Sequence, residues 1–207
     1  MGCCGRPDTK PAEPKPPPAL TLQEQLLAKW TSTIRQSDHI KTWTGDGELA
    51  YIMEQATKAS FAVEIGTYLG KSAKCMLDAN PNLHLWCVDP GIVDFISETA
   101  CYFMRDEIAQ GRCEVIKKYS QEAAPMLEHM RGKLDLVFID GNHAFDYVYL
   151  DLKLWVPLVR SGGVVCGHDW EAPPSYPKKN DVARAVEFVL FDKVTEPVPR
   201  IWQHIKP

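Results

Sequence analysis

The chain has 207 residues, 45% of them hydrophobic, and a formal net charge of -4 at pH 7. This length suits one well-buried domain and is short for two. The acidic balance argues against a nucleic-acid partner, because proteins that bind nucleic acid concentrate Lys and Arg on one face. The seven cysteines are odd in number and lack paired CxxC spacing, so we expect reduced thiols in a cytoplasmic protein.

The first segment, MGCCGRPDTKPAEPKPPPAL, holds six prolines and few apolar side chains. This composition predicts a disordered tail over residues 1–20, followed by one folded domain over residues 21–207. The opening MGCC is similar to a lipidation signal, but Arg6 stands where that signal requires Ser or Thr. Membrane attachment is therefore expected only if MGCC is lipidated, and an unmodified tail is favoured.

The rest of the chain alternates between predicted helices and strands. The capping box TLQE at Thr21 opens a helix through about Ile34, and a second helix is predicted over residues 48–58. Apolar runs predict strands, and the segments between them predict helices. The strands are 61–66, 83–89, 113–118, 134–140, 162–169, 193–198 and 200–205, and the helices between them are 70–79, 96–110, 120–130, 145–159 and 181–191.

This alternation predicts a Rossmann-like, doubly wound α/β fold. Its seven-stranded sheet should be mostly parallel, with an antiparallel last strand. In such sheets ligands bind at the carboxyl ends of the strands, so those ends are the places to search for a site. The proline-rich loop 171–181 lies at the same edge and is a candidate substrate lid.

The first two strands end in residues that favour a ligand site. Gly66 and Gly70 permit a tight turn and close approach to backbone N–H groups, although their spacing matches neither GxGxxG nor GxxxxGK[ST]. Glu64 would repel a pyrophosphate and suits a ligand with an ammonium or sulfonium cation. Asp89 can accept hydrogen bonds from the hydroxyls of a ribose. Each signal alone is often structural, but together they favour ligand binding.

Five motifs, in order, resemble those of class I S-adenosylmethionine-dependent methyltransferases: VEIGTYLGKSA, LWCVDP, KKYSQEAAPML, LDLVFIDGNH and SGGVVCGHDW. The resemblance covers about residues 40–205. It is strongest to metal-dependent O-methyltransferases of the catechol O-methyltransferase type and the macrolide-sugar (macrocin-like) type. It implies S-adenosylmethionine as methyl donor, a hydroxyl of a small molecule or sugar as acceptor, and a divalent metal.

The resemblance also implies a role for each matching residue. Glu64 and Gly66 would contact the methionine part of the donor, Gly70 would let the backbone approach it, and Ser72 would bind its carboxylate. Asp89 would bind the ribose, and Ser120 and Gln121 would border the adenine. A helix N-cap is an alternative reason for Ser120 at this position, and both roles can hold together. The full donor-binding set is Glu64, Gly66, Gly70, Ser72, Asp89, Ser120, Gln121 and Asp140.

By the same resemblance, Asp140 and Asp169 match metal ligands, and His168 falls where relatives often carry a third, acidic ligand. An imidazole there would make Mg less favoured and Mn or Fe more favoured. Two converging carboxylates favour a cation. The alternative, in which His168 bonds a loop and no metal binds, stays open.

His143 follows Asp140 by three residues, a spacing at which macrolide-sugar enzymes carry a catalytic base. Imidazole can accept a hydroxyl proton near neutral pH, so His143 and Asp140 are the candidate catalytic residues, with a plain surface role as the alternative for His143. Two other functions remain open. One is a metal-dependent hydroxylase on the same fold, similar to cephalosporin hydroxylase, and the other is a non-catalytic, cofactor-binding or lipid-anchored protein.

Overall fold

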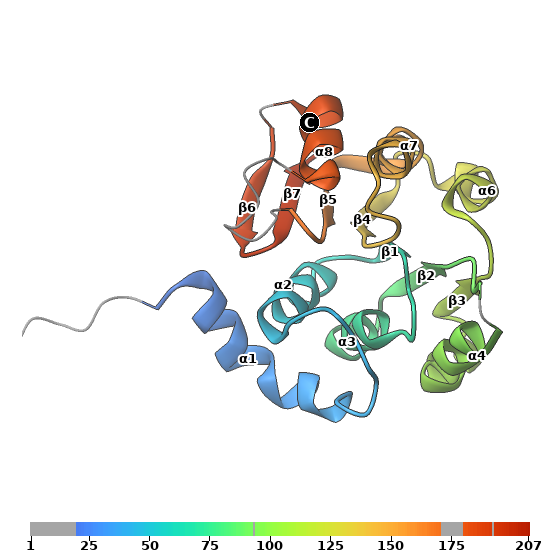
Figure 1. Ribbon diagram of the computed structural model, residues 1–207. Coiled ribbons are helices and arrows are strands. Elements are labelled where there is room, and N and C mark those ends of the chain that lie inside the picture. The colour runs from blue at the N-terminus through green and yellow to red at the C-terminus, as the bar shows by residue number, and fades with distance from the viewer. Residues whose placement is uncertain (1–19, 93, 171–179, 192) are drawn as a thin grey trace, which may run out of the picture.

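The computed structural model describes residues 20–92, 94–170, 180–191 and 193–207 (Figure 1). Residues 1–19 of the predicted tail and residues 171–179 of the predicted lid lie outside these described residues. Within the described ranges, no helix combines the length and the apolar character that crossing a bilayer requires.

One seven-stranded sheet forms the centre of the domain, with the strand order β3-β2-β1-β4-β5-β7-β6. The strands from β1 to β5 run parallel, whereas β7 is antiparallel to both of its neighbours. The predicted fold class is therefore confirmed, including the antiparallel last strand. The strands are β1 Phe61–Ile65, β2 His84–Val88, β3 Cys113–Ile116, β4 Leu134–Ile139, β5 Val159–Gly167, β6 Thr195–Val198 and β7 Ile201–Ile205.

Helices cover both faces of the sheet and enclose two apolar cores (Figure 1). One core joins the sheet to α1 Leu22–Gln36, α2 Asp46–Ala56, α3 Lys71–Ala79, α4 Asp94–Phe103 and α5 Arg105–Ala109. The other joins it to α6 Ser120–Ala123, the 3₁₀ helix η1 Ala124–Met130, α7 Phe145–Trp155, the 3₁₀ helix η2 Val156–Leu158, and α8 Asp181–Leu190. Covering both faces explains why β1 and β2 read as continuous apolar runs.

Most predicted helices are observed, with three corrections. The capping box at Thr21 is confirmed, because the Thr21 N–H donates to Glu24 at 2.8 Å and the Glu24 N–H donates back at 3.2 Å. The predicted helix 96–110 is broken at Met104, which has non-helical φ and ψ and is fully buried. The predicted helices 120–130 and 145–159 tighten into 3₁₀ turns around Pro125 and Pro157, since proline lacks the N–H that continues an α-helix.

Candidate active site

The central strands β1 and β4 bring two loops into direct backbone contact. Ile65 pairs with Ile139 at the carboxyl ends of these strands, and the Asp140 N–H donates to the Ile65 carbonyl at 2.7 Å. Gly66, next along the chain, has φ of +91°, and a Cβ on it would lie 2.1 Å from the Asp140 carbonyl oxygen. Only glycine fits here, so Gly66 allows the loop after β1 to pass against the loop after β4.

We expect Gly66→Ala to lower the free energy of unfolding by about 3 kcal/mol, because the methyl group meets rigid backbone at a positive φ. Gly132→Ala is the matched control. Gly132 also has positive φ, +69°, but a Cβ on it would meet nothing within 4 Å, so the cost there should be about 1 kcal/mol. Urea unfolding of both variants measures the difference, and equal losses would show that the close approach is unimportant.

Two cavities lie side by side at this edge of the sheet and share Gly66, Tyr68, Asp140 and Gly141. The first has a volume of about 410 Å³ and includes Asp89, Ser120 and Gln121 in its wall. The second has a volume of about 260 Å³ and includes Gly70, Ser72, His143, His168 and Asp169. The structure therefore gathers the predicted donor, metal and catalytic residues at one edge, apart from Glu64, which lines neither cavity.

In the first cavity, loops hold the predicted ribose acid in place. Asp89 accepts the Tyr68 N–H at one carboxylate oxygen and the Gly91 N–H at the other, both at 2.8 Å. Each oxygen keeps a lone pair for a further donor. The side chain is thus oriented by the loops after β1 and β2 before any ligand arrives.

Ser120 in the same cavity belongs to a buried polar chain. It is the first residue of α6, whose cap position is Tyr119, so the alternative N-cap role for Ser120 is wrong. Its hydroxyl donates to Asp151 and accepts the Trp155 indole N–H at 2.7 Å. Burial raises the pKa of Asp151 to about 6, although the Ser120 hydrogen bond opposes the shift. The two hydrogen bonds hold the Ser120 side chain in a fixed position in the wall of the first cavity.

Glu64 is fully buried beside the second cavity, behind Ser72. The Ser72 hydroxyl donates to one oxygen of Glu64, so this serine hydrogen is already used in the free protein. The other Glu64 oxygen and the Thr67 hydroxyl find no partner within the described part of the chain. Burial raises the pKa of Glu64 to about 8, and the negative charges of Asp140 and Asp89 add to the rise.

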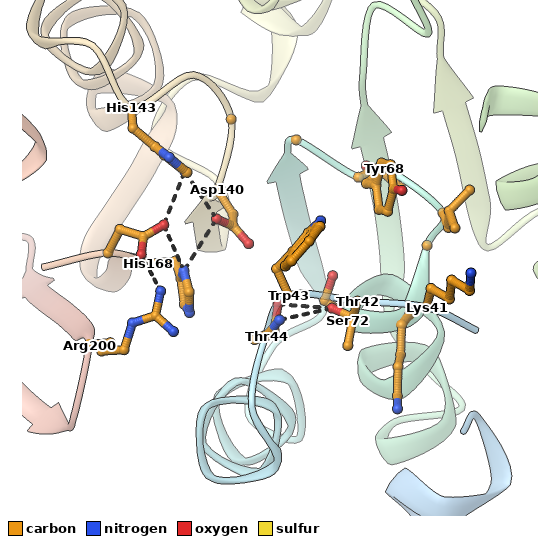
Figure 2. A pocket seen from close by; sticks show the side chains of 17 residues that line it. Lys41, Thr42, Trp43, Thr44, Tyr68, Ser72, Asp140, His143, His168 and Arg200 are labelled. Atoms are coloured by element: carbon orange, nitrogen blue, oxygen red, sulfur yellow. Dashed lines mark hydrogen bonds and ion pairs between the residues drawn. The ribbon is translucent and has the colours of Figure 1, made fainter. Parts of the chain in front are cut away.

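Two carboxylates and two imidazoles converge in the second cavity (Figure 2). His168 Nδ1 lies 3.0 Å from Asp169 Oδ2 and 3.6 Å from Asp140 Oδ1. His143 Nε2 lies 3.2 Å from Asp169 Oδ2 and 3.6 Å from Asp140 Oδ1. We call Asp140, His143, His168 and Asp169 the acid–histidine cluster. Asp169 has φ of +55°, which an Asp tolerates better than most residues and which is typical of functional positions.

His143 is a further candidate ligand beside the predicted metal trio of Asp140, His168 and Asp169. Asp140, His143 and Asp169 have potential ligand atoms that all lie within 4.8 Å of one another. His143 is on a loop with a side chain 55% exposed, whereas His168 is 3% exposed at the end of β5. Both imidazoles therefore face the two carboxylates, His143 from the solvent-exposed side and His168 from the buried side.

The charges of the cluster extend to two residues outside the predicted site residues. His168 Nε2 faces the Glu48 carboxylate at 2.7 Å, and Arg200, in the turn between β6 and β7, binds Asp169. Burial alone would lower the pKa of His168, but Asp169 and Glu48 outweigh it and raise the pKa to about 9. The hydrogen bond to His168 holds the pKa of Asp169 well below its usual range. A hydrogen bond to Asp140 similarly raises the pKa of His143.

Aromatic side chains form the wall opposite the cluster (Figure 2). Trp43, 86% exposed, precedes α2, and Tyr68, 39% exposed, follows β1. Neither was among the predicted site residues. The second cavity thus has one charged wall and one aromatic wall.

The strand order, which reverses between β1 and β4, and cavities at that reversal define the class I methyltransferase fold. A family model described as a methyltransferase domain matches residues 63–170, and the chain belongs to this family. The class expected from the sequence, that of class I S-adenosylmethionine-dependent methyltransferases, is thereby confirmed for family and fold. The catechol-like or macrocin-like subtype stays a prediction.

Individual relatives are distant. The chain is 27% identical over 135 residues to the uncharacterized protein R132 of Acanthamoeba polyphaga mimivirus, and the match spans 60% of each chain. An O-methyltransferase from Bacillus cereus, solved in complex with SAH, is similar in fold with a TM-score of 0.63 at 13% identity, covering 88% of this chain and 91% of that one. The SAH-bound methyltransferase PaMTH1 of Podospora anserina gives a TM-score of 0.62 at 13% identity, covering 88% of each chain.

Proposed function

We propose that the protein transfers the methyl group of S-adenosylmethionine to a hydroxyl of a small molecule or sugar, with the help of a divalent metal. The observation that carries this proposal is the position of Asp140, which lines both cavities. A donor spanning the cavities would bring its methyl group to the acid–histidine cluster, where an acceptor hydroxyl could meet it in line. The solved relatives with bound SAH support the donor part of the proposal.

The donor would lie with its nucleoside in the first cavity and its methionine part at the turn after β1. Asp89 offers free lone pairs for ribose hydroxyls, and Ser120 and Gln121 stand in the same wall. Near the second cavity, the unpartnered oxygen of buried Glu64 suits the cationic end of the donor. Because the Ser72 hydrogen is taken by Glu64, a contact from Ser72 to the donor carboxylate would require that hydroxyl to turn.

The acid–histidine cluster fits a divalent cation in spacing and charge. Its nitrogen and oxygen atoms are separated by 3.0–3.6 Å, and neighbouring ligands around an ion with bonds of about 2.1 Å lie about 3.0 to 3.4 Å apart. Glu48, Asp140 and Asp169 against Arg200 leave two negative charges when both imidazoles are neutral. Because the pKa of His168 is raised to about 9, a metal that binds near neutral pH would displace a proton from this ring. Mixed nitrogen and oxygen ligands favour Mn, Fe or Zn over Mg.

Asp140, His168 and Asp169 would hold the metal, and a bound ion would supply acidity to the acceptor hydroxyl. We assign His168 rather than His143 to this set because His168 is buried and its far nitrogen is anchored by Glu48. The more exposed His143, on a loop, would take the hydroxyl proton at Nε2 as the oxygen attacks. Trp43 and Tyr68 would cover the acceptor from the opposite wall and exclude water.

Two imidazoles beside carboxylates also suit iron, so a metal-dependent hydroxylase on the same fold is the second candidate. The two candidates differ in what they consume. A hydroxylase needs dioxygen and leaves S-adenosylmethionine unchanged, whereas a methyltransferase produces SAH without oxygen.

The test is calorimetric titration with S-adenosylmethionine, with and without Mn²⁺, followed by incubation with methyl-labelled donor and a panel of sugar and phenolic hydroxyl acceptors, both under argon and in air. We expect donor binding, and label transfer that Mn²⁺ increases and EDTA abolishes. Absence of donor binding would overturn the methyltransferase proposal. Methyl transfer that is unaffected by EDTA would overturn only the proposed metal requirement. Turnover that requires oxygen and forms no SAH would favour the hydroxylase.

A further inference from the structure

Glu48 is a buried acid that was not among the predicted site residues. It lies in the first turn of α2, and its side chain is 12% exposed. The carboxylate reaches from the helix covering one face of the sheet to the end of β5, and it meets a residue 120 positions away in the sequence. Burying a carboxylate is costly unless it is paired, so its partners show what it does.

One oxygen of Glu48 has two partners. Oε2 accepts the Gly45 N–H at 2.7 Å and also lies 2.7 Å from His168 Nε2. The second oxygen, Oε1, lies 3.8 Å from Arg200 Nη1. A carboxylate can only accept, so Nε2 of His168 must carry a hydrogen. By the same rule Nδ1, which faces Asp169 at 3.0 Å, carries a hydrogen in the metal-free protein. When a cation displaces that hydrogen, Nε2–H still faces Glu48, and the bare nitrogen is Nδ1, the atom that faces Asp140 and Asp169.

We propose that Glu48 is the positioning residue of the metal site, fixing His168 in the Nε2–H tautomer so that the Nδ1 lone pair points between Asp140 and Asp169. This inference rests on the proposed metal role of the acid–histidine cluster. A carboxylate behind a ligating histidine sets the orientation of the ring and strengthens it as a ligand. Glu48 thereby decides that the site presents nitrogen as well as oxygen, and so which metals it prefers.

The same carboxylate ties the metal site to the acceptor wall. The Glu48 carboxylate accepts a hydrogen bond from the Gly45 N–H, and Gly45 ends the loop that carries Trp43. Trp43 forms the rim of the second cavity. The loop and the histidine ring therefore share one anchor. Loss of the anchor should loosen both the ligand and the aromatic rim.

The test compares Co²⁺ and Mg²⁺ affinity by calorimetric titration of the full chain. Glu48→Ala removes both partners, and Glu48→Gln keeps an oxygen that can accept from Gly45 and His168 but removes the charge. We expect Glu48→Ala to weaken Co²⁺ binding about 10- to 100-fold, Glu48→Gln to weaken it less, and Mg²⁺ binding to change less than Co²⁺ binding in both. The matched control is Glu24→Gln, which alters an equivalent capping box far from the site and should leave both affinities unchanged.

A double-mutant cycle separates positioning from a merely structural role. If Glu48 acts through His168, adding Glu48→Ala to a His168→Ala protein should lower the Co²⁺ affinity no further. If His168→Ala does not fold, His168→Gln provides the background instead. Additive losses, or equal losses for Co²⁺ and Mg²⁺, would overturn the proposal for Glu48. If the unaltered protein binds neither ion, the metal part of the proposed function itself fails, which is a distinct result.

Discussion

Asp140→Asn is expected to lower kcat/KM for methyl transfer by about 100- to 1000-fold, the largest effect of any single change in the domain. Asp140 lines both cavities and faces both imidazoles, so its charge serves the donor side and the acid–histidine cluster together. The asparagine keeps the size of the side chain but removes the negative charge and one anionic ligand. The remaining methyl-transfer activity of Asp140→Asn should therefore no longer depend on the Mn²⁺ concentration.

The measurement is steady-state transfer of labelled methyl groups over a range of Mn²⁺ concentrations, with thermal unfolding of each variant. Asp146→Asn is the control, because Asp146 is an exposed acid in the first turn of α7, outside both cavities. Asp146→Asn should retain normal kinetics. Near-normal transfer by Asp140→Asn would contradict the central place given to this carboxylate.

The affinity for S-adenosylmethionine should rise about 20-fold between pH 6 and 7.5, because binding must ionise Glu64. Burial raises the pKa of Glu64 to about 8 in the free protein, so most Glu64 side chains are protonated at pH 6. A cationic donor stabilises the ionised form and lowers that pKa in the complex, so binding releases a proton. Affinity therefore increases as pH rises toward 8.

Calorimetry at pH 7 in buffers of different ionisation enthalpy counts the proton released on binding. We expect nearly one proton for the unaltered protein and none for Glu64→Gln, whose affinity should be nearly flat from pH 6 to 7.5. Glu107→Gln is the control, since Glu107 is equally a buried acid but lies outside both cavities and pairs with Lys74 and Arg112. A pH dependence shared by Glu64→Gln would place the titrating group elsewhere.

The same pKa affects stability without a ligand. Because the folded pKa of Glu64 lies above its ordinary value of 4.5, the contribution of this residue is fully present below pH 4.5 and is lost as pH rises through 8. Glu64→Gln should remove this loss. At neutral pH, binding of the cationic donor should then offset the stability that the free protein loses when buried Glu64 ionises.

Much of the site could be predicted because it follows from local sequence and one topological rule. Parallel strands end at a common edge, so the residues that follow β1, β2, β4 and β5 had to come together once those strands were recognised. This is why Gly66 and Asp89 were found from their places after apolar runs. Asp140 and Asp169 also follow such runs, but their proposed metal role came from the resemblance to metal-dependent O-methyltransferases.

The remainder depends on packing that no local pattern encodes. Glu48 and Arg200 reach the cluster from α2 and from the turn between β6 and β7, and neither was among the predicted site residues. Which imidazole faces the carboxylates from the buried side also depends on tertiary contacts, because His168 is oriented by its contact with Glu48. The break at Met104 was missed because the apolar helical pattern continues across it.

The anchoring of Asp169 by Arg200 also has a consequence for the order of folding. Arg200 reaches Asp169 only when β7 pairs antiparallel with β5. Glu48 must in turn meet His168, which lies 120 residues later in the chain. Contacts of such long sequence separation form after loop-closure entropy has been overcome. We therefore expect the central strands to pair first, and a partly folded chain to hold a formed core while its charged edge is still open.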